Sequence, residues 1–281
     1  MLDKGDSVGI VACSDAMDEE YRDQIRELEN ALYDIGLNTV ISEYVFKDKD
    51  TKISPGEKAD EINRMFRNER IKAVFDVSGG DSANSILEYL DYDLIEDSDR
   101  LFFGYSDVTA VLNAIYTRCG KETCLYQVRN LIYEHQERQM ADFEMSIIGG
   151  EDDLYDFHYE FVQGDSMKGV VIGGNTRCFL KLAGTPYMPS FKHKILFLEG
   201  LSGNEERVRA YFTQLKHMGA FSEINGVLLG TFTGLMSRED ITAADILTEV
   251  CNDSKLPVAV TDEIGHGADS KAIIIGRELE L

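Results

Sequence analysis

Ser106 stands where a strand is expected to break into a helix. Residues 101–105 read Leu-Phe-Phe-Gly-Tyr, a strand-like run, and residues 107–112 have the composition of a helix. A serine at such a turn presents its hydroxyl above a sheet, and the amide of Asp107 in the first helical turn would point at an oxyanion beside it. Gly104 leaves room for the turn, but Val108 replaces the second glycine of the usual esterase pattern. The alternative role for Ser106 is that of a helix N-cap.

A serine nucleophile needs a base, and His266 is the candidate among five histidines. It stands between Gly265 and Gly267, in a loop that follows the expected strand 257–260. Loops at strand ends commonly carry catalytic groups. The other histidines have polar or helical surroundings and are expected at the surface; they are His135, His158, His193 and His217.

Glu199 is the candidate that would orient the imidazole. It ends the apolar run 195–198 and precedes Gly200. Burying an unpaired carboxylate is costly, which favours a partner such as imidazole, although the side chain could also simply reach water. The chain order serine, glutamate, histidine is that of α/β-type hydrolases.

Gly79 and Gly80 follow the expected strand 71–77 and offer bare backbone amides at the sheet edge. Such amides can donate to an oxyanion or bind another anion. The sequence contains neither of the glycine-rich patterns typical of phosphate or dinucleotide binding, and we expect no cofactor or metal.

Short apolar runs alternate with amphipathic helices along the chain. A helix is expected from Tyr21 to Ile35, and a second opens with a capping box between Ser54 and Glu57 around Pro55. This alternation predicts an α/β fold in which a mainly parallel sheet is flanked by helices, with sites at the carboxyl ends of the strands. Strands are also expected at 168–172, 194–198, 226–231, 257–260 and 272–275, with 173–175 as a turn into a helix.

The pattern weakens around an acidic stretch at 151–153. We therefore predict an N-terminal domain with the nucleophile elbow at 1–139, a linker at 140–166 and a smaller C-terminal α/β domain at 167–281. Ser106 would lie in the first domain, and Glu199 and His266 in the second.

Composition narrows the classes of partner. The 51 acidic and 28 basic side chains give a formal charge of −23, which disfavours nucleic acid polymers and anionic membranes. The N-terminus lacks the pattern of a signal peptide, and no apolar run approaches the length of a membrane span. Five scattered cysteines suit reduced thiols, so a cytoplasmic location is expected.

Taken together, these segments resemble the LD-carboxypeptidase family of serine peptidases, which includes muramoyltetrapeptide carboxypeptidases and microcin C immunity peptidases. The matching segments, in order, are Gly5-Asp6-Ser7-Val8-Gly9-Ile10-Val11-Ala12, Ser78-Gly79-Gly80 with Asn84 and Leu87, Leu90-Asp91-Tyr92, Gly104-Tyr105-Ser106-Asp107-Val108-Thr109, Gly173-Gly174-Asn175, Gly184-Thr185-Pro186-Tyr187, Leu196-Phe197-Leu198-Glu199 and Gly265-His266-Gly267.

The resemblance implies Ser106 as nucleophile, His266 as general base and acid, and Glu199 as its orienting residue. It also implies an oxyanion hole from the amides of Asp107, Gly79 and Gly80. Family members include homodimers, and the muramoyl enzymes act in the cytoplasm on wall peptides, releasing terminal D-alanine from an L-configured centre. A small peptide or an aminoacyl amide is therefore the expected substrate.

Some residues depart from the family pattern. Cys13 replaces a common proline, and residues 127–130, Gln-Val-Arg-Asn, replace a Gly-Pro downstream of the nucleophile helix. The chain has no tryptophan, on which the microcin immunity branch stacks its nucleotide. Thr233 stands about where that branch carries an amine-recognising glutamate.

Three hypotheses stay open on sequence alone. The first is a carboxypeptidase, for which Arg129 could hold the substrate carboxylate. The second is a hydrolase of aminoacyl-nucleotide amides with an aromatic platform near Tyr155 to Phe161. The third is an inactive ligand-binding member of the family.

Overall fold

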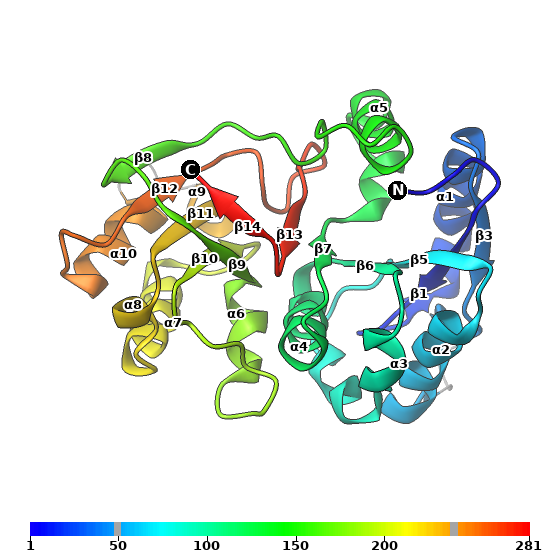
Figure 1. The fold of residues 1–281 in the computed structure, drawn as a ribbon, viewed down its shortest axis with the longest axis horizontal. Coiled ribbons are helices and arrows are strands. Elements are labelled where there is room, and N and C mark those ends of the chain that lie inside the picture. Colours follow the sequence, from blue (N-terminus) through cyan, green and yellow to red (C-terminus); the bar gives the residue numbers. More distant parts are fainter. Residues whose placement is uncertain (48–51, 237–240) are drawn as a thin grey trace.

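Two six-stranded sheets lie side by side in the computed structural model, which describes residues 1–47, 52–236 and 241–281. Helices cover both sheets, as Figure 1 shows. The predicted α/β fold class is confirmed.

The first sheet is parallel except at one edge, in the strand order β13-β7-β6-β5-β1-β3. Its strands are β1 (Ser7–Val11), β3 (Asn38–Ile41), β5 (Ile71–Asp76), β6 (Leu101–Gly104), β7 (Thr123–Leu125) and β13 (Ile273–Ile275). A small parallel pair is formed by β2 (Met17–Asp18) and β4 (Phe46–Lys47).

Helices cover the first sheet on both faces because its strands are apolar on both sides. Val74 packs in the cluster that contains α2 and α4, whereas the adjacent Phe75 packs in the cluster that contains α1 and α5. The helical segments of this half are η1 (Glu19–Tyr21), α1 (Arg22–Asp34), α2 (Pro55–Arg67), η2 (Ala83–Tyr89), α3 (Tyr92–Glu96), η3 (Ser106–Val108), α4 (Thr109–Cys119), η4 (Val128–Ile132) and α5 (Gln136–Ile147).

The second sheet has the order β14-β9-β10-β11-β12-β8, with a parallel centre and an antiparallel strand at each edge. Its strands are β8 (Glu160–Gln163), β9 (Lys168–Asn175), β10 (Lys194–Gly200), β11 (Gly226–Phe232), β12 (Val258–Val260) and β14 (Glu278–Glu280). The helical segments here are α6 (Thr176–Phe179), η5 (Leu180–Leu182), α7 (Glu205–His217), α8 (Ala220–Glu223), α9 (Thr233–Met236) and α10 (Ala243–Cys251).

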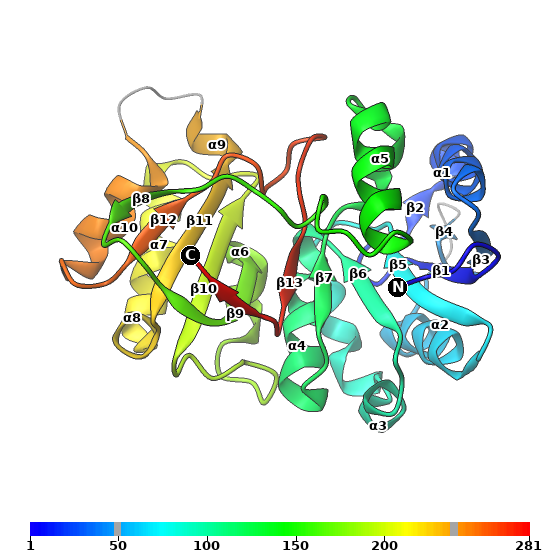
Figure 2. The same ribbon diagram turned by 45° about the horizontal axis from the view of Figure 1, so that its top comes forward.

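Three segments differ from the sequence interpretation. The predicted linker contains β8, which pairs with β12, and the predicted C-terminal strand β13 pairs with β7 of the first sheet. The expected turn at 173–175 is the end of β9, and α6 begins directly after it at Thr176. The predicted domain boundaries stay a prediction, since strands from the last part of the chain enter both sheets (Figure 2).

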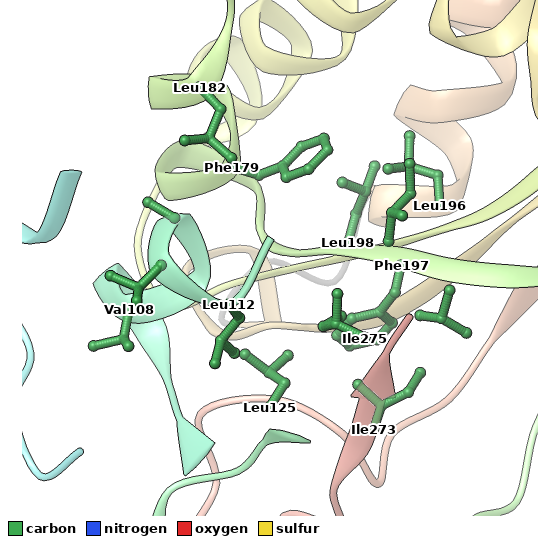
Figure 3. Packing of buried hydrophobic residues seen from close by; sticks show 14 of the residues in the cluster. Val108, Leu112, Leu125, Phe179, Leu182, Leu196, Phe197, Leu198, Ile273 and Ile275 are labelled. Carbon is green, nitrogen blue, oxygen red and sulfur yellow. The ribbon is translucent and has the colours of Figure 1, made fainter. Parts of the chain in front are cut away.

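One hydrophobic cluster runs through both halves. Figure 3 shows side chains from η3, α4, β7 and β13 of the first half close to side chains from α6, η5 and β10 of the second; the labelled residues are Val108, Leu112, Leu125, Phe179, Leu182, Leu196, Phe197, Leu198, Ile273 and Ile275. This shared core fixes the ends of β6 and β10 relative to each other, and both ends carry candidate site residues.

Candidate active site

Ser106 lies at a strained turn directly after β6. Its φ is 52°, in the left-handed region that non-glycine residues seldom adopt. The extended Tyr105 precedes it and the short helix η3 begins at Ser106 itself. A Cβ on Gly104 would overlap Val108, so the valine side chain packs where glycine leaves space. This is the sharp turn that the sequence predicts.

His266 reaches Ser106 from the loop after β12. Its Nε2 lies 3.2 Å from Ser106 Oγ, and its Nδ1 lies 2.6 Å from Glu199 Oε2. The loop is held on β11, because the Thr231 amide donates to Ile264 O and Gly265 packs against the Thr231 side chain. The three predicted side chains are therefore in mutual contact, although 160 residues separate Ser106 from His266.

Glu199 is fully buried near the end of β10, where the register with β11 shifts between Leu198 and Gly200. Its Oε1 has no hydrogen-bond partner among the described residues. A buried carboxylate with one oxygen on an imidazole and the other unpaired is costly to maintain for stability alone. Such an arrangement is typical of a functional site.

The Tyr105 ring packs against the imidazole of His266. Its ring centroid lies 4.5 Å from that of His266. Burial raises the pKa of the Tyr105 phenol, and the Glu199 charge adds to the shift. The phenol oxygen has no hydrogen-bond partner within the described part of the chain, so the ring acts through packing.

The Asp107 side chain holds the neighbouring loops together. Its buried carboxylate accepts from Ser14 Oγ at 2.6 Å and from the Ala83 amide at 2.8 Å, and it pairs with Lys181. From the sequence, a role was predicted only for the Asp107 amide, and this function of its side chain was not predicted. No local signal predicts it, because its partners come from distant parts of the chain.

The Gly79-Gly80 turn is fixed by contacts on both sides. Gly79 O accepts from the Asp15 amide at 3.1 Å, and Gly80 O accepts from Arg177 at 3.2 Å. Gly80 has a φ of 131°, and a Cβ there would overlap the Asp15 carboxylate. Glycine is therefore required at Gly80, and the turn is held one strand away from Ser106.

Asp76 anchors the start of this turn. Its buried carboxylate accepts from the Cys13 amide at 2.6 Å and from Ser78 Oγ at 2.7 Å. Burial raises the pKa of Asp76, while these hydrogen bonds oppose the shift. The carboxylate thus ties the loop after β1 to the loop after β5.

A small pocket of about 50 Å³ opens at Ser106. Arg177, Tyr211 and Phe232 also line it. Phe232 additionally lines a larger, mainly apolar cavity of about 450 Å³ beside β11 and β12. The small pocket at Ser106 therefore lies next to a larger, mainly apolar cavity, and Phe232 lines both.

The remaining predicted residues take other positions. Arg129 packs over the Tyr133 ring at 5.7 Å, and its neighbour Asn130 contacts Gly267 O at 3.5 Å. The four other histidines are exposed, and Thr233 begins α9. The aromatic rings between residues 155 and 161 are partly buried. Phe157 and Tyr159 contact each other edge to face with ring centroids 6.4 Å apart, and Tyr159 and Phe161 do so at 5.9 Å.

Neither a metal-binding cluster nor a membrane-spanning helix occurs among the described residues. They contain no group of three or more His, Cys, Asp or Glu side chains arranged to hold a metal ion. None of their helices combines the length and apolar character needed to cross a membrane.

Comparison with known proteins matches most of the chain to one family. Residues 8–126 match the LD-carboxypeptidase N-terminal domain, and residues 168–281 match the LD-carboxypeptidase C-terminal domain. A protein named as a probable murein peptide carboxypeptidase from Bacillus subtilis is 25% identical over 98% of this chain and 88% of its own length. The microcin C7 self-immunity protein MccF of Escherichia coli is 25% identical over 80% of this chain and 75% of its own length.

A solved structure has the same fold. MccF in complex with aspartyl sulfamoyl adenosine is 23% identical and superposes with a TM-score of 0.88, covering 100% of this chain and 94% of that one. The chain therefore belongs to the LD-carboxypeptidase family, peptidase family S66, and is related to hydrolases.

Proposed function

We propose that the protein is a serine carboxypeptidase that hydrolyses an amide bond through an acyl-enzyme. The observation that carries the proposal is the continuous contact from Ser106 Oγ to His266 Nε2, at 3.2 Å, and from His266 Nδ1 to Glu199 Oε2, at 2.6 Å. With Nδ1 protonated and donating to Glu199, Nε2 is free to accept the serine proton.

The reaction follows from this arrangement. His266 takes the proton as Ser106 Oγ attacks the substrate carbonyl, and then gives it to the leaving amine. Water then attacks the carbonyl of the acyl-enzyme while His266 takes its proton, and His266 gives that proton to Ser106 Oγ as the acyl group leaves. Glu199 stabilises the imidazolium that forms in each half of the reaction.

Backbone amides would hold the oxyanion of each tetrahedral intermediate. The candidates are Asp107 in the first turn of η3, and Gly79 and Gly80 in the fixed turn after β5. One such donor typically stabilises the transition state by about 3 kcal/mol. Support comes from the anchoring of both segments by the buried Asp107 carboxylate and its neighbours.

The substrate we propose is a murein tetrapeptide, from which the enzyme removes the terminal D-residue beside an L-configured centre. The relative named as a murein peptide carboxypeptidase supports this choice. A second candidate is the amide of an aminoacyl nucleotide, favoured by the fold shared with MccF, which was solved with aspartyl sulfamoyl adenosine bound.

Direct hydrolysis assays separate the two. Purified protein is incubated with a murein tetrapeptide and with aspartyl sulfamoyl adenosine, and products are followed by mass spectrometry. Release of D-alanine, absent in Ser106→Ala, supports the carboxypeptidase, and release of aspartate supports the second candidate. Turnover that is equal in Ser106→Ala would contradict both.

A further inference from the structure

A second polar cavity lies, like Ser106, at the carboxyl ends of the strands of the first sheet. It has a volume of about 370 Å³ and is lined by the loop after β1, by β4, by residues 52–53, by the start of α2 and by the loop before η2. Its charged and hydroxyl side chains are Asp15, Lys47, Lys52, Lys58 and Ser82, and we refer to it as the basic pocket.

Three ammonium groups and one carboxylate line this pocket, in a chain whose formal charge is −23. Among the residues described, none of the three lysines forms an ion pair within 4 Å. Lys58 donates to Ser14 O. Burial lowers the pKa of Lys58, Asp15 partly opposes this shift, and Lys47 lowers the pKa further. Among the described residues that line the pocket, positive charge exceeds negative charge, and a bound anion would neutralise this excess.

The strand order fixes where the basic pocket lies relative to Ser106. Ser106 follows β6, Gly79 follows β5 and Asp15 follows β1, and these strands are consecutive neighbours. Two strand spacings correspond to about 10 Å. Asp15 forms the near wall, since its amide donates to Gly79 O at 3.1 Å and its Oδ1 accepts from Ser82 at 2.9 Å.

We propose that the basic pocket is a substrate subsite for an anionic oxygen group, a carboxylate or a phosphate, held about 10 Å from the bond that is cleaved. This inference rests on the proposed hydrolase function of Ser106. An extended peptide covers about 3.5 Å per residue, so the anionic group would lie about three residues from the cleaved bond.

The first test uses paired substrates and a double variant. Two peptides are compared that differ only in a free carboxylate or its amide about three residues from the cleaved bond. The wild type is expected to have a KM about tenfold lower for the carboxylate peptide, with similar kcat. Lys47→Gln combined with Lys52→Gln should abolish this difference, whereas Lys192→Gln, at an exposed lysine outside the pocket, should retain it.

The second test measures binding without turnover. Calorimetry on Ser106→Ala, with and without the two glutamines, uses the carboxylate peptide, its amide and AMP. We expect the anionic ligand to bind about tenfold more weakly in the double variant and when NaCl rises from about 0.05 to about 0.5 M. If only the carboxylate peptide binds more weakly to the double variant, the group held in the pocket is a carboxylate. If only AMP binds more weakly, that group is a phosphate.

The outcomes distinguish the subsite from the function. Charge-dependent binding without any hydrolysis by the wild type would support the subsite and contradict the proposed function. Equal affinity of the double variant and its parent for every anion, with hydrolysis intact, would overturn the subsite alone.

Discussion

At the scale of single residues, the site is built from groups that are costly to keep where they are. Ser106 adopts a φ of 52°, and Glu199 is fully buried with one oxygen unpaired among the described residues. Both features lie where the Ser106 hydroxyl, the His266 imidazole and the Glu199 carboxylate come together. The strain is compensated by the packing around them.

Glu199→Gln tests the orienting role. Glutamine keeps the shape but cannot stabilise the imidazolium, and its amide group can favour the wrong tautomer of His266. We expect kcat to fall by about 10³- to 10⁴-fold with the far-ultraviolet circular dichroism unchanged. Activity within a few-fold of the wild type would show that Glu199 has no part in the reaction.

Two substitutions of Tyr105 test whether this residue acts through ring packing or through a hydrogen bond. Its ring contacts His266, but its hydroxyl has no partner among the described residues. Tyr105→Phe should therefore keep kcat close to the wild-type value, and Tyr105→Ala should lower it roughly tenfold to a hundredfold because the imidazole loses its support. The reverse order in steady-state assays would assign a chemical role to the phenol.

At the scale of elements, local signals in the sequence determine where helices begin. Ser54 caps α2, and the reciprocal hydrogen bonds with Glu57 form the predicted capping box. Ser54→Ala is expected to lower the free energy of unfolding by about 1 kcal/mol, measured by urea denaturation at pH 7. Ser190→Ala, at an exposed serine outside the helices, serves as the control.

The same capping box has a defined pH dependence. Hydrogen bonds from Ser54 lower the pKa of Glu57 in the folded state. Its contribution is therefore present above the pKa of the unfolded chain and is lost as the pH falls through the lower, folded pKa. The stability difference between wild type and Glu57→Gln should shrink on acidification through this range; a difference that grows would contradict the assignment.

At the scale of the whole molecule, buried contacts couple the two halves. The Asn113 side chain in α4 donates to Gly173 O at 2.7 Å and accepts from the Gly173 amide at 2.9 Å in β9. Asn113→Ala leaves both backbone groups unpaired in the core and should lower the free energy of unfolding by about 2 kcal/mol or more. Denaturation should remain one transition in the wild type, and two separate wild-type transitions would contradict the coupling.

Assembly and location also belong to this scale. The homodimer and the cytoplasmic location stay predictions. Analytical ultracentrifugation of the purified chain tests the first, and fractionation of the source cells tests the second.

Most of the features that could be predicted from the sequence depend on residues close together in the chain. The elbow at Ser106, the capping box at Ser54 and the order of strands and helices follow from residue types at short spacing. The pairing of β13 with β7 was not predicted, because an apolar run of three isoleucines suits either sheet and only tertiary packing decides. The Asp107–Lys181 pair was missed for the same reason, since 74 residues separate its members.

The contact between His266 Nε2 and Ser106 Oγ predicts that His266 activates Ser106. Reaction with a fluorophosphonate probe, followed by peptide mass spectrometry, measures this directly. We predict one phosphonylated residue, Ser106, with labelling abolished in Ser106→Ala and strongly slowed in His266→Ala. Labelling at another residue, or equal labelling rates in the wild type and His266→Ala, would contradict the account.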